Sequence, residues 1–148
     1  MIINSPLKGK LQPLESLEDG VFSAKIMGDG VVVMPQESVV RAPMAGKLVT
    51  VFPTGHAYGI EAKDGTKVLI HIGIDSVNLN GEGFDVKVKQ GKKVKQGDPL
   101  VEVNFAGIKD QIPSIGVIMI VTADSERKIV GKTETGATNI DKCVIETA

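Results

Sequence analysis

The residues most able to do chemistry in this chain of 148 residues are its two histidines, His56 and His71. An imidazole has an unperturbed pKa of about 6.5, so near neutral pH it can bind a metal ion, exchange a proton or attack a phosphoryl group. Each of these reactions gains from a second imidazole close by. The elements that position the two rings therefore decide which chemistry is open.

His71 lies in a segment whose pattern predicts a β-strand, Val68-Leu69-Ile70-His71-Ile72-Gly73-Ile74-Asp75. β-Branched residues occupy every even position, and leucine, histidine, glycine and aspartate occupy the odd positions. Because successive side chains of a strand point to opposite faces, the even positions are expected in the core and the odd face carries His71. A glycine inside a strand often marks the close approach of another backbone or a ligand.

A predicted hairpin brings the second histidine to the same face. Asp64-Gly65 separates the strand from a preceding strand-like segment, and this dipeptide is the preferred filling of a two-residue type I′ turn. In that register Tyr58 lies opposite His71, and His56 lies opposite Gly73. The two histidines then become diagonal neighbours, with backbones roughly 7–8 Å apart and rings within reach of each other.

The rest of the chain is also rich in strand patterns. Gly28-Asp29-Gly30 predicts a turn, and a short helix is expected over 105–111, ended by Pro113. The patterns Ser5–Leu11 and Ala42–Leu48 form a weak repeat that predicts two similar corners. Many short strands without alternating helices favour an all-β sandwich or barrel. Strand segments are expected at 2–11, 21–27, 31–35, 47–52, 55–63, 68–75, 115–121, 128–130 and 143–145.

Composition excludes several classes of protein. The chain has 17 Lys and Arg against 18 Asp and Glu, which gives no basic surface for nucleic acid or membrane lipid. Its single cysteine, Cys143, can form no internal disulfide, and no apolar segment approaches membrane-spanning length. We therefore expect a single domain over residues 1–148 in the cytoplasm, without direct membrane insertion.

Three uses of the histidines compete. A zinc peptidase could use both histidines with Asp75, but a catalytic zinc needs three protein ligands and no third histidine exists. A biotinyl or lipoyl carrier is suggested by Ala42–Leu48 and Val94–Val101, but no lysine follows at the position that such domains modify. The third use is a covalent phosphohistidine, in which one ring attacks and the other donates a hydrogen bond to the phosphoryl oxygens.

The motif His71-Ile72-Gly73-Ile74-Asp75-Ser76-Val77, preceded by Thr54–Ile60, resembles the glucose-type enzyme IIA of the bacterial sugar phosphotransferase system. The segments Val21–Gly30, Leu79–Phe84 and Pro113–Ile115 also fit this family, and the resemblance extends from Ile2 to Ile145. It implies an antiparallel β-sandwich, or barrel-sandwich hybrid, with at most one or two short helices.

The resemblance also implies a role for each site residue. His71 would carry the phosphoryl group on Nε2, and His56 would hydrogen-bond that group. Thr54 would hold His56 in place, and the main chain at Gly73 would orient His71 through its other nitrogen.

The partners follow from the same resemblance. The phosphocarrier protein HPr would be the donor, and a cysteine of the enzyme IIB domain of a sugar transporter would be the acceptor, with no metal or cofactor. We expect a monomer, without the amphipathic N-terminal anchor of some relatives, and the sugar is chosen by the membrane component. The docking surface would comprise Phe22, Ile26, Met27, Phe52, Leu69 and Val77, with Asp75 meeting a basic residue of the partner.

Overall fold

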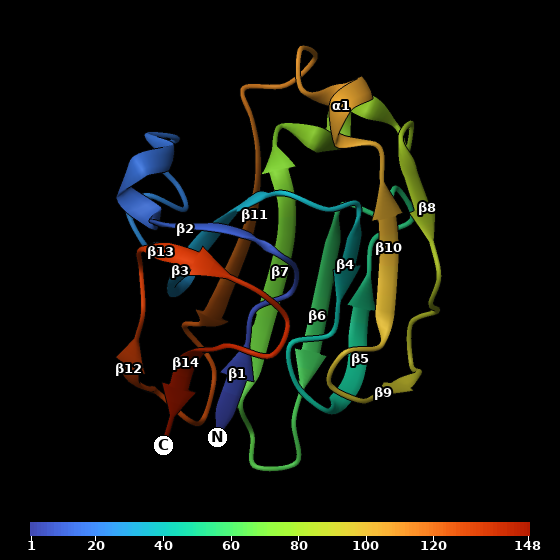
Figure 1. Ribbon diagram of the computed structural model, residues 1–148. Coiled ribbons are helices and arrows are strands. Elements are labelled where there is room, and N and C mark those ends of the chain that lie inside the picture. The colour runs from blue at the N-terminus through green and yellow to red at the C-terminus, as the bar shows by residue number, and fades with distance from the viewer.

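The regular structure of the chain is almost entirely antiparallel β-sheet, as the computed structural model of residues 1–148 shows (Figure 1). The predicted all-β class with one short α-helix is confirmed. The strands are β1 (Ile2–Asn4), β2 (Gly9–Pro13), β3 (Gly28–Pro35), β4 (Val39–Arg41), β5 (Gly46–Val51), β6 (Ala57–Glu61), β7 (Lys67–Ile74), β8 (Phe84–Val86), β9 (Lys93–Val94), β10 (Pro99–Val103), β11 (Ser114–Thr122), β12 (Ile129–Lys132), β13 (Gly136–Thr138) and β14 (Cys143–Thr147). The helical elements are α1 (Phe105–Ile108) and the 3₁₀ turns η1 (Leu14–Leu17) and η2 (Ser76–Leu79).

One large sheet and two small sheets enclose the main core. The large sheet has the strand order β13-β2-β3-β11-β7-β6-β5-β9, and the small sheets have the orders β1-β14-β12 and β4-β10-β8. The main cluster of buried apolar side chains joins Ile70 and Met119 of the large sheet to Ile145 of one small sheet and Leu100 of the other. A sandwich results because each sheet buries one apolar face against another.

A second, smaller cluster covers the opposite face of the large sheet. It contains Val32 of β3 with Ile118 and Ile120 of β11, and Leu14 and Phe22 from the segment between β2 and β3 complete it. Neighbours such as Val31 and Met119 belong to the main cluster instead, as the two-residue period of a strand requires. His71, whose direct partner on β11 is Ile118, lies on the face of this second cluster.

The alternation predicted for β7 holds along most of the strand. Val68, Ile70 and Ile72 are fully buried in the main core, and Leu69 packs against the second cluster. The prediction for Ile74 is wrong, because this side chain packs on the second cluster too. The register between β7 and β11 shifts just before Ile74, and that irregularity interrupts the alternation.

The predicted hairpin register is wrong by one residue. Ala57, and not Tyr58, pairs with His71. The loop has three residues, 63–65, because the N–H of Ala62 donates to the carbonyl of Thr66 and the N–H of Gly65 donates back to Ala62. Gly65 has φ +89°, which places it in the left-handed conformation that ends three-residue hairpin loops.

The predicted turn at residues 28–30 is also wrong, because these residues begin β3. A Cβ atom on Gly28 would lie 2.2 Å from the carbonyl oxygen of Val121, and one on Gly30 would lie 2.0 Å from that of Met119. The glycines therefore permit the close approach of β3 to β11. Residues 21–27, expected as a strand, form bends and turns instead.

The two repeated corners pair with each other. The N–H of Asn4 donates to the carbonyl of Pro43 at 2.9 Å, and the N–H of Arg41 donates to the carbonyl of Pro6 at 2.7 Å. Gly9 and Gly46 then begin β2 and β5, so the two copies occupy similar places in the fold. The predicted helix is shorter than expected: α1 ends at Ile108, three residues before Gln111.

Candidate active site

His71 lies in the middle of β7, and one of its two ring nitrogens is already hydrogen-bonded. Its Nδ1 is 2.8 Å from the carbonyl oxygen of Gly73. Because a carbonyl can only accept, the hydrogen bond places the proton on Nδ1 and the lone pair of the neutral ring on Nε2. The side chain is half-buried. Nε2 is therefore the nitrogen available for a nucleophilic attack.

Gly73 adopts a conformation that other residues rarely reach. Its φ is +77°, and a Cβ atom at this position would lie 2.8 Å from Cδ1 of Ile112 and 3.0 Å from the carbonyl oxygen of Ser114. The residue coincides with the register shift between β7 and β11. The glycine thus allows the backbone to turn its carbonyl group onto His71.

His56 reaches the same site by a route that the predicted register did not contain. With Ala57 opposite His71, a regular strand would have directed His56 toward the opposite face. However, β6 begins only at Ala57, and the turn before it places Gly55 at φ +76°. The carbonyl of His56 still accepts the N–H of Ile72 at 2.7 Å. The predicted proximity of the histidines is correct, but the turn produces it.

The second imidazole also has one nitrogen engaged. Thr54 Oγ1 lies 2.5 Å from Nδ1 of His56, and the ring is buried, with 3 % of the residue exposed. Because Nδ1 of each histidine has a protein partner, each Nε2 is left to face a third group. Such an arrangement suits two imidazoles that act together on one ligand.

Aromatic rings surround the pair. The ring centroids of His56 and His71 lie 5.2 Å apart, with an edge-to-face orientation. Phe22 lies 5.0 Å from His71, and Phe52 lies 5.1 Å from His56. These contacts restrict the orientation of both imidazoles and keep water away from much of their surface.

Asp19 positions Phe22 and was not predicted from the sequence. Its carboxylate oxygens accept the backbone N–H groups of Phe22 at 3.1 Å and of Ser23 at 2.8 Å. An aspartate three residues before an aromatic residue in a turn-rich segment is a recognisable capping signal. Phe22 in turn contacts His71, which is distant in sequence, so the link between Asp19 and the histidines could not be predicted.

A short ion-pair network holds the rest of this segment. Nζ of Lys25 lies 2.9 Å from Glu15 and 3.6 Å from Asp29, and Lys132 bonds Asp29 from β12 at 2.8 Å. Each exposed pair contributes little by itself, but the network ties the segment carrying Phe22 and Met27 to two other parts of the chain.

Burial keeps the histidines neutral. Burial, with the neighbouring His56 as the next largest cause, lowers the pKa of His71 to about 4. The hydrogen bond to Gly73 and the carboxylates of Asp19 and Asp75 act in the opposite direction without offsetting the burial. Burial likewise lowers the pKa of His56. At neutral pH both rings are uncharged, which is the form in which an imidazole is a nucleophile.

The first prediction concerns this titration. In an NMR titration, the imidazole of His71 should have its midpoint near pH 4, and that of His56 should lie below 6.5. An unfolded histidine titrates at about 6.5, so the unfolded chain binds more protons between pH 6.5 and 4. The contribution of His71 to the free energy of unfolding should therefore fall by about 3 kcal/mol as the pH drops through that window. Urea unfolding of the protein and of His71→Gln across this range measures the difference, and a midpoint near 6.5 would contradict the prediction.

His71, but not His56, lines an open depression of about 700 Å³ on the face of β5, β6 and β7. Of the predicted docking residues, Phe22, Met27, Phe52 and Leu69 line it, whereas Ile26, Val77 and Asp75 are exposed outside it. Its remaining lining residues, including Val49, Lys67 and Asp124, were not predicted. Lys67 could have been, because it shares a strand face with Leu69 and His71.

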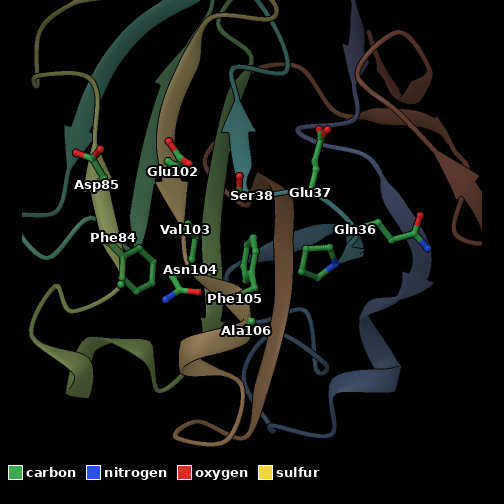
Figure 2. Close-up of a pocket in the computed structure, with 12 residues that line it drawn as sticks. Gln36, Glu37, Ser38, Phe84, Asp85, Glu102, Val103, Asn104, Phe105 and Ala106 are labelled. Atoms are coloured by element: carbon green, nitrogen blue, oxygen red, sulfur yellow. The ribbon is translucent and has the colours of Figure 1, made fainter.

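A second cavity, of about 900 Å³, contains neither histidine. It lies between the segment that joins β3 to β4, the start of β8 and the end of β10, with Phe84 and Phe105 on either side of Asn104 (Figure 2). Asp85 and Glu102 also line it. This cavity has no histidine or cysteine nucleophile, so the histidine depression is the better candidate for group transfer.

The zinc alternative requires a third ligand beside the two histidines. No group of three or more His, Cys, Asp and Glu side chains lies close enough together to hold a metal ion. Asp75, the expected third ligand, is exposed and has φ +59° at the residue before η2. The residues present therefore do not fit a catalytic zinc.

The fold and the site together define a β-sandwich protein with a paired-histidine centre. The family model of the phosphoenolpyruvate-dependent sugar phosphotransferase system, EIIA 1, matches residues 1–127. The solved structure of glucose permease IIA from Mycoplasma capricolum is similar, with 35 % sequence identity and a TM-score of 0.92 over 98 % of this chain and 94 % of that chain. The chain belongs to the glucose-type EIIA family of this system. It is thus a phosphotransfer protein of sugar transport, and none of its helices has the length and apolar character needed to cross a membrane.

Proposed function

We propose that residues 1–148 act as one EIIA domain that accepts a phosphoryl group from HPr on Nε2 of His71 and passes it to a cysteine of a IIB domain. The observation that carries this proposal is the commitment of both Nδ1 atoms, one to Gly73 and one to Thr54, beside rings only 5.2 Å apart. That geometry leaves two Nε2 atoms for one phosphoryl group.

The transfer divides between the two imidazoles. Neutral Nε2 of His71 attacks the phosphorus of the donor phosphohistidine, and the bond between phosphorus and the donor nitrogen breaks. The proton on Nδ1 remains bonded to Gly73, so the positive charge that develops on the ring is partly balanced by that carbonyl. His56 donates from Nε2 to a phosphoryl oxygen, which requires the Thr54 hydroxyl to donate to Nδ1 of His56. A IIB thiolate then attacks the phosphorus, so that a P–S bond forms and the bond between phosphorus and Nε2 of His71 breaks.

Incubation with enzyme I, HPr and phosphoenolpyruvate tests the proposal. Intact mass should increase by one acid-labile phosphoryl group, and chelator should not prevent the increase. Metal-dependent peptide cleavage, or a biotinylated or lipoylated lysine in cells, would instead support one of the alternatives considered above.

The second prediction concerns docking. Met27 is 43 % exposed and lines the depression, so an aspartate there would be desolvated without a partner when HPr docks. Met27→Asp should slow transfer from HPr by about tenfold or more. Leu69→Asp should act in the same direction, although Leu69 also packs on the second cluster and its replacement costs stability.

Val130 on β12 supplies the matched control. It is 64 % exposed and does not line the depression, so Val130→Asp should leave transfer unchanged. Stopped-flow or quench measurements of the three variants at several HPr concentrations separate docking from chemistry. Equal rates for Met27→Asp and Val130→Asp would remove this face from the docking surface.

A further inference from the structure

A buried serine, Ser76, lies just after β7, the strand that carries His71. Ser76 begins η2 and is only 1 % exposed, and its Oγ donates a hydrogen bond of 2.5 Å to the carbonyl oxygen of Ile72. Its Cβ also lies 3.4 Å from the position that a Cβ atom on Gly73 would take. The side chain therefore contacts the backbone at the point where it turns toward His71.

The carbonyl that Ser76 holds belongs to the peptide bond between Ile72 and Gly73. This segment coincides with the register shift against β11, so the regular ladder does not fix its orientation. Gly73, with φ +77°, has more rotational freedom than any other residue type would have. An additional hydrogen bond at this peptide limits the rotation that would carry the next carbonyl away from Nδ1 of His71.

Ile72 links the two histidines. The N–H of Ile72 donates to the carbonyl of His56, and the C=O of Ile72 accepts from Ser76. Gly73, the next residue, then presents its own carbonyl to Nδ1 of His71. Hydrogen bonds thus connect Ile72 to His56 and to Ser76, and the peptide bond connects Ile72 to Gly73.

We propose that Ser76 is a positioning residue for phosphoryl transfer: by holding the carbonyl of Ile72, it keeps the carbonyl of Gly73 on Nδ1 of His71. The proton then stays on Nδ1 and the lone pair on Nε2. Loss of the Ser76 hydroxyl allows the 72–73 peptide to rotate, and His71 populates the other tautomer, in which Nε2 carries the proton and cannot attack. This role rests on the function proposed above.

The chain offers a matched control for an effect on stability alone. Ser5 is also fully buried, and its Oγ also donates to one backbone carbonyl, that of Leu7, at 2.8 Å. It lies between β1 and β2, outside the histidine depression. Ser5→Ala and Ser76→Ala therefore remove the same kind of bond, but only Ser76→Ala removes one beside Gly73.

The direct readout is the tautomer of His71 in the unphosphorylated protein, measured by ¹⁵N NMR of labelled histidine. The wild type and Ser5→Ala should show a protonated Nδ1 and an unprotonated Nε2. Ser76→Ala should shift both nitrogens toward averaged values, and Ser76→Thr, which keeps the hydroxyl, should restore them. Transfer from HPr should fall about 10–100-fold in Ser76→Ala and should recover in Ser76→Thr. A loss of this size is typical when a hydrogen-bond partner that orients a metal-bound histidine is removed.

Two results would overturn the proposal. One is an unchanged ¹⁵N spectrum of His71 in Ser76→Ala, and the other is an equal loss of transfer in Ser5→Ala. Should Ser76→Ala fail to fold, Ser76→Cys provides a weaker donor of similar size, and the proposal then requires intermediate ¹⁵N shifts. Because the NMR measurement needs no phosphoryl donor, it still decides the role of Ser76 if the wild type accepts no phosphoryl group, an outcome that would refute the proposed function instead.

Discussion

His71→Ala is expected to abolish the phosphorylated protein altogether. In the proposed transfer, Nε2 of His71 forms the bond to phosphorus, and a neighbouring donor cannot replace a nucleophile. In the proposed tautomer the Thr54 hydroxyl donates to Nδ1 of His56, so Nε2 of His56 carries the proton and has no lone pair for attack. Intact mass after prolonged incubation with enzyme I, HPr and phosphoenolpyruvate should show no added phosphoryl group.

His71→Gln is the companion variant, because it keeps a polar side chain of similar reach but supplies no nucleophilic nitrogen. Both variants should retain the fold, since His71 is only half-buried and its ring is not part of either apolar cluster. Site mapping of the wild type under alkaline conditions completes the test. Stable label on His71→Ala, or label on His56 in the wild type, would reverse the assignment.

His56→Ala is expected to slow phosphoryl transfer without preventing it. A hydrogen-bond donor aimed at charge that develops in a transition state is typically worth about 2.7–4 kcal/mol, which corresponds to about 10²–10³ in rate. The His56 ring meets the conditions for such a contribution, because it is buried and held by Thr54 at 5.2 Å from His71. His56→Ala should thus become labelled only on long incubation.

His56→Gln separates the hydrogen bond from the loss of the ring. The amide can still donate to a phosphoryl oxygen, so this variant should be faster than His56→Ala. Quench-flow rates for both variants, compared at saturating HPr, measure the difference. Equal rates for the wild type and His56→Ala would show that His56 takes no part in transfer.

The sequence predicted the strand that carries His71 because its alternation spans eight residues without a break. It failed on the hairpin register because Asp64-Gly65 also fits a three-residue loop in which glycine takes the left-handed position. The predicted proximity of His56 and His71 is nevertheless correct, because the turn that contains Gly55 compensates for the one-residue error in register. Local patterns thus predicted that the two histidines are neighbours, but not the register and the turn that bring them together.

The parts of the site that depend on contacts between distant segments could not be predicted. Val49 reaches the depression from β5 and Asp124 from the turn after β11, and Asp19 acts on His71 both through Phe22 and through its charge. Gly28 was predicted to lie in a turn, whereas a glycine is required there because the backbone of β11 leaves no room for a Cβ atom. Each of these roles depends on contacts between segments that are distant in sequence, and the spacing of residues within one segment does not predict such contacts.

The short loop between β6 and β7 has a consequence for the order in which the protein assembles. A hairpin with a three-residue connection closes within microseconds, so β6 and β7 should meet early in folding, and the turn at Gly55 then brings His56 to His71. The bulge at Gly73 that fixes the tautomer of His71 depends on β11, which must be recruited from much farther along the chain at a larger loop-closure cost. Proximity of the rings therefore precedes their chemical orientation. Under the mechanism proposed above, a partly opened protein that loses only β11 should keep the β6–β7 hairpin and lose phosphoryl transfer.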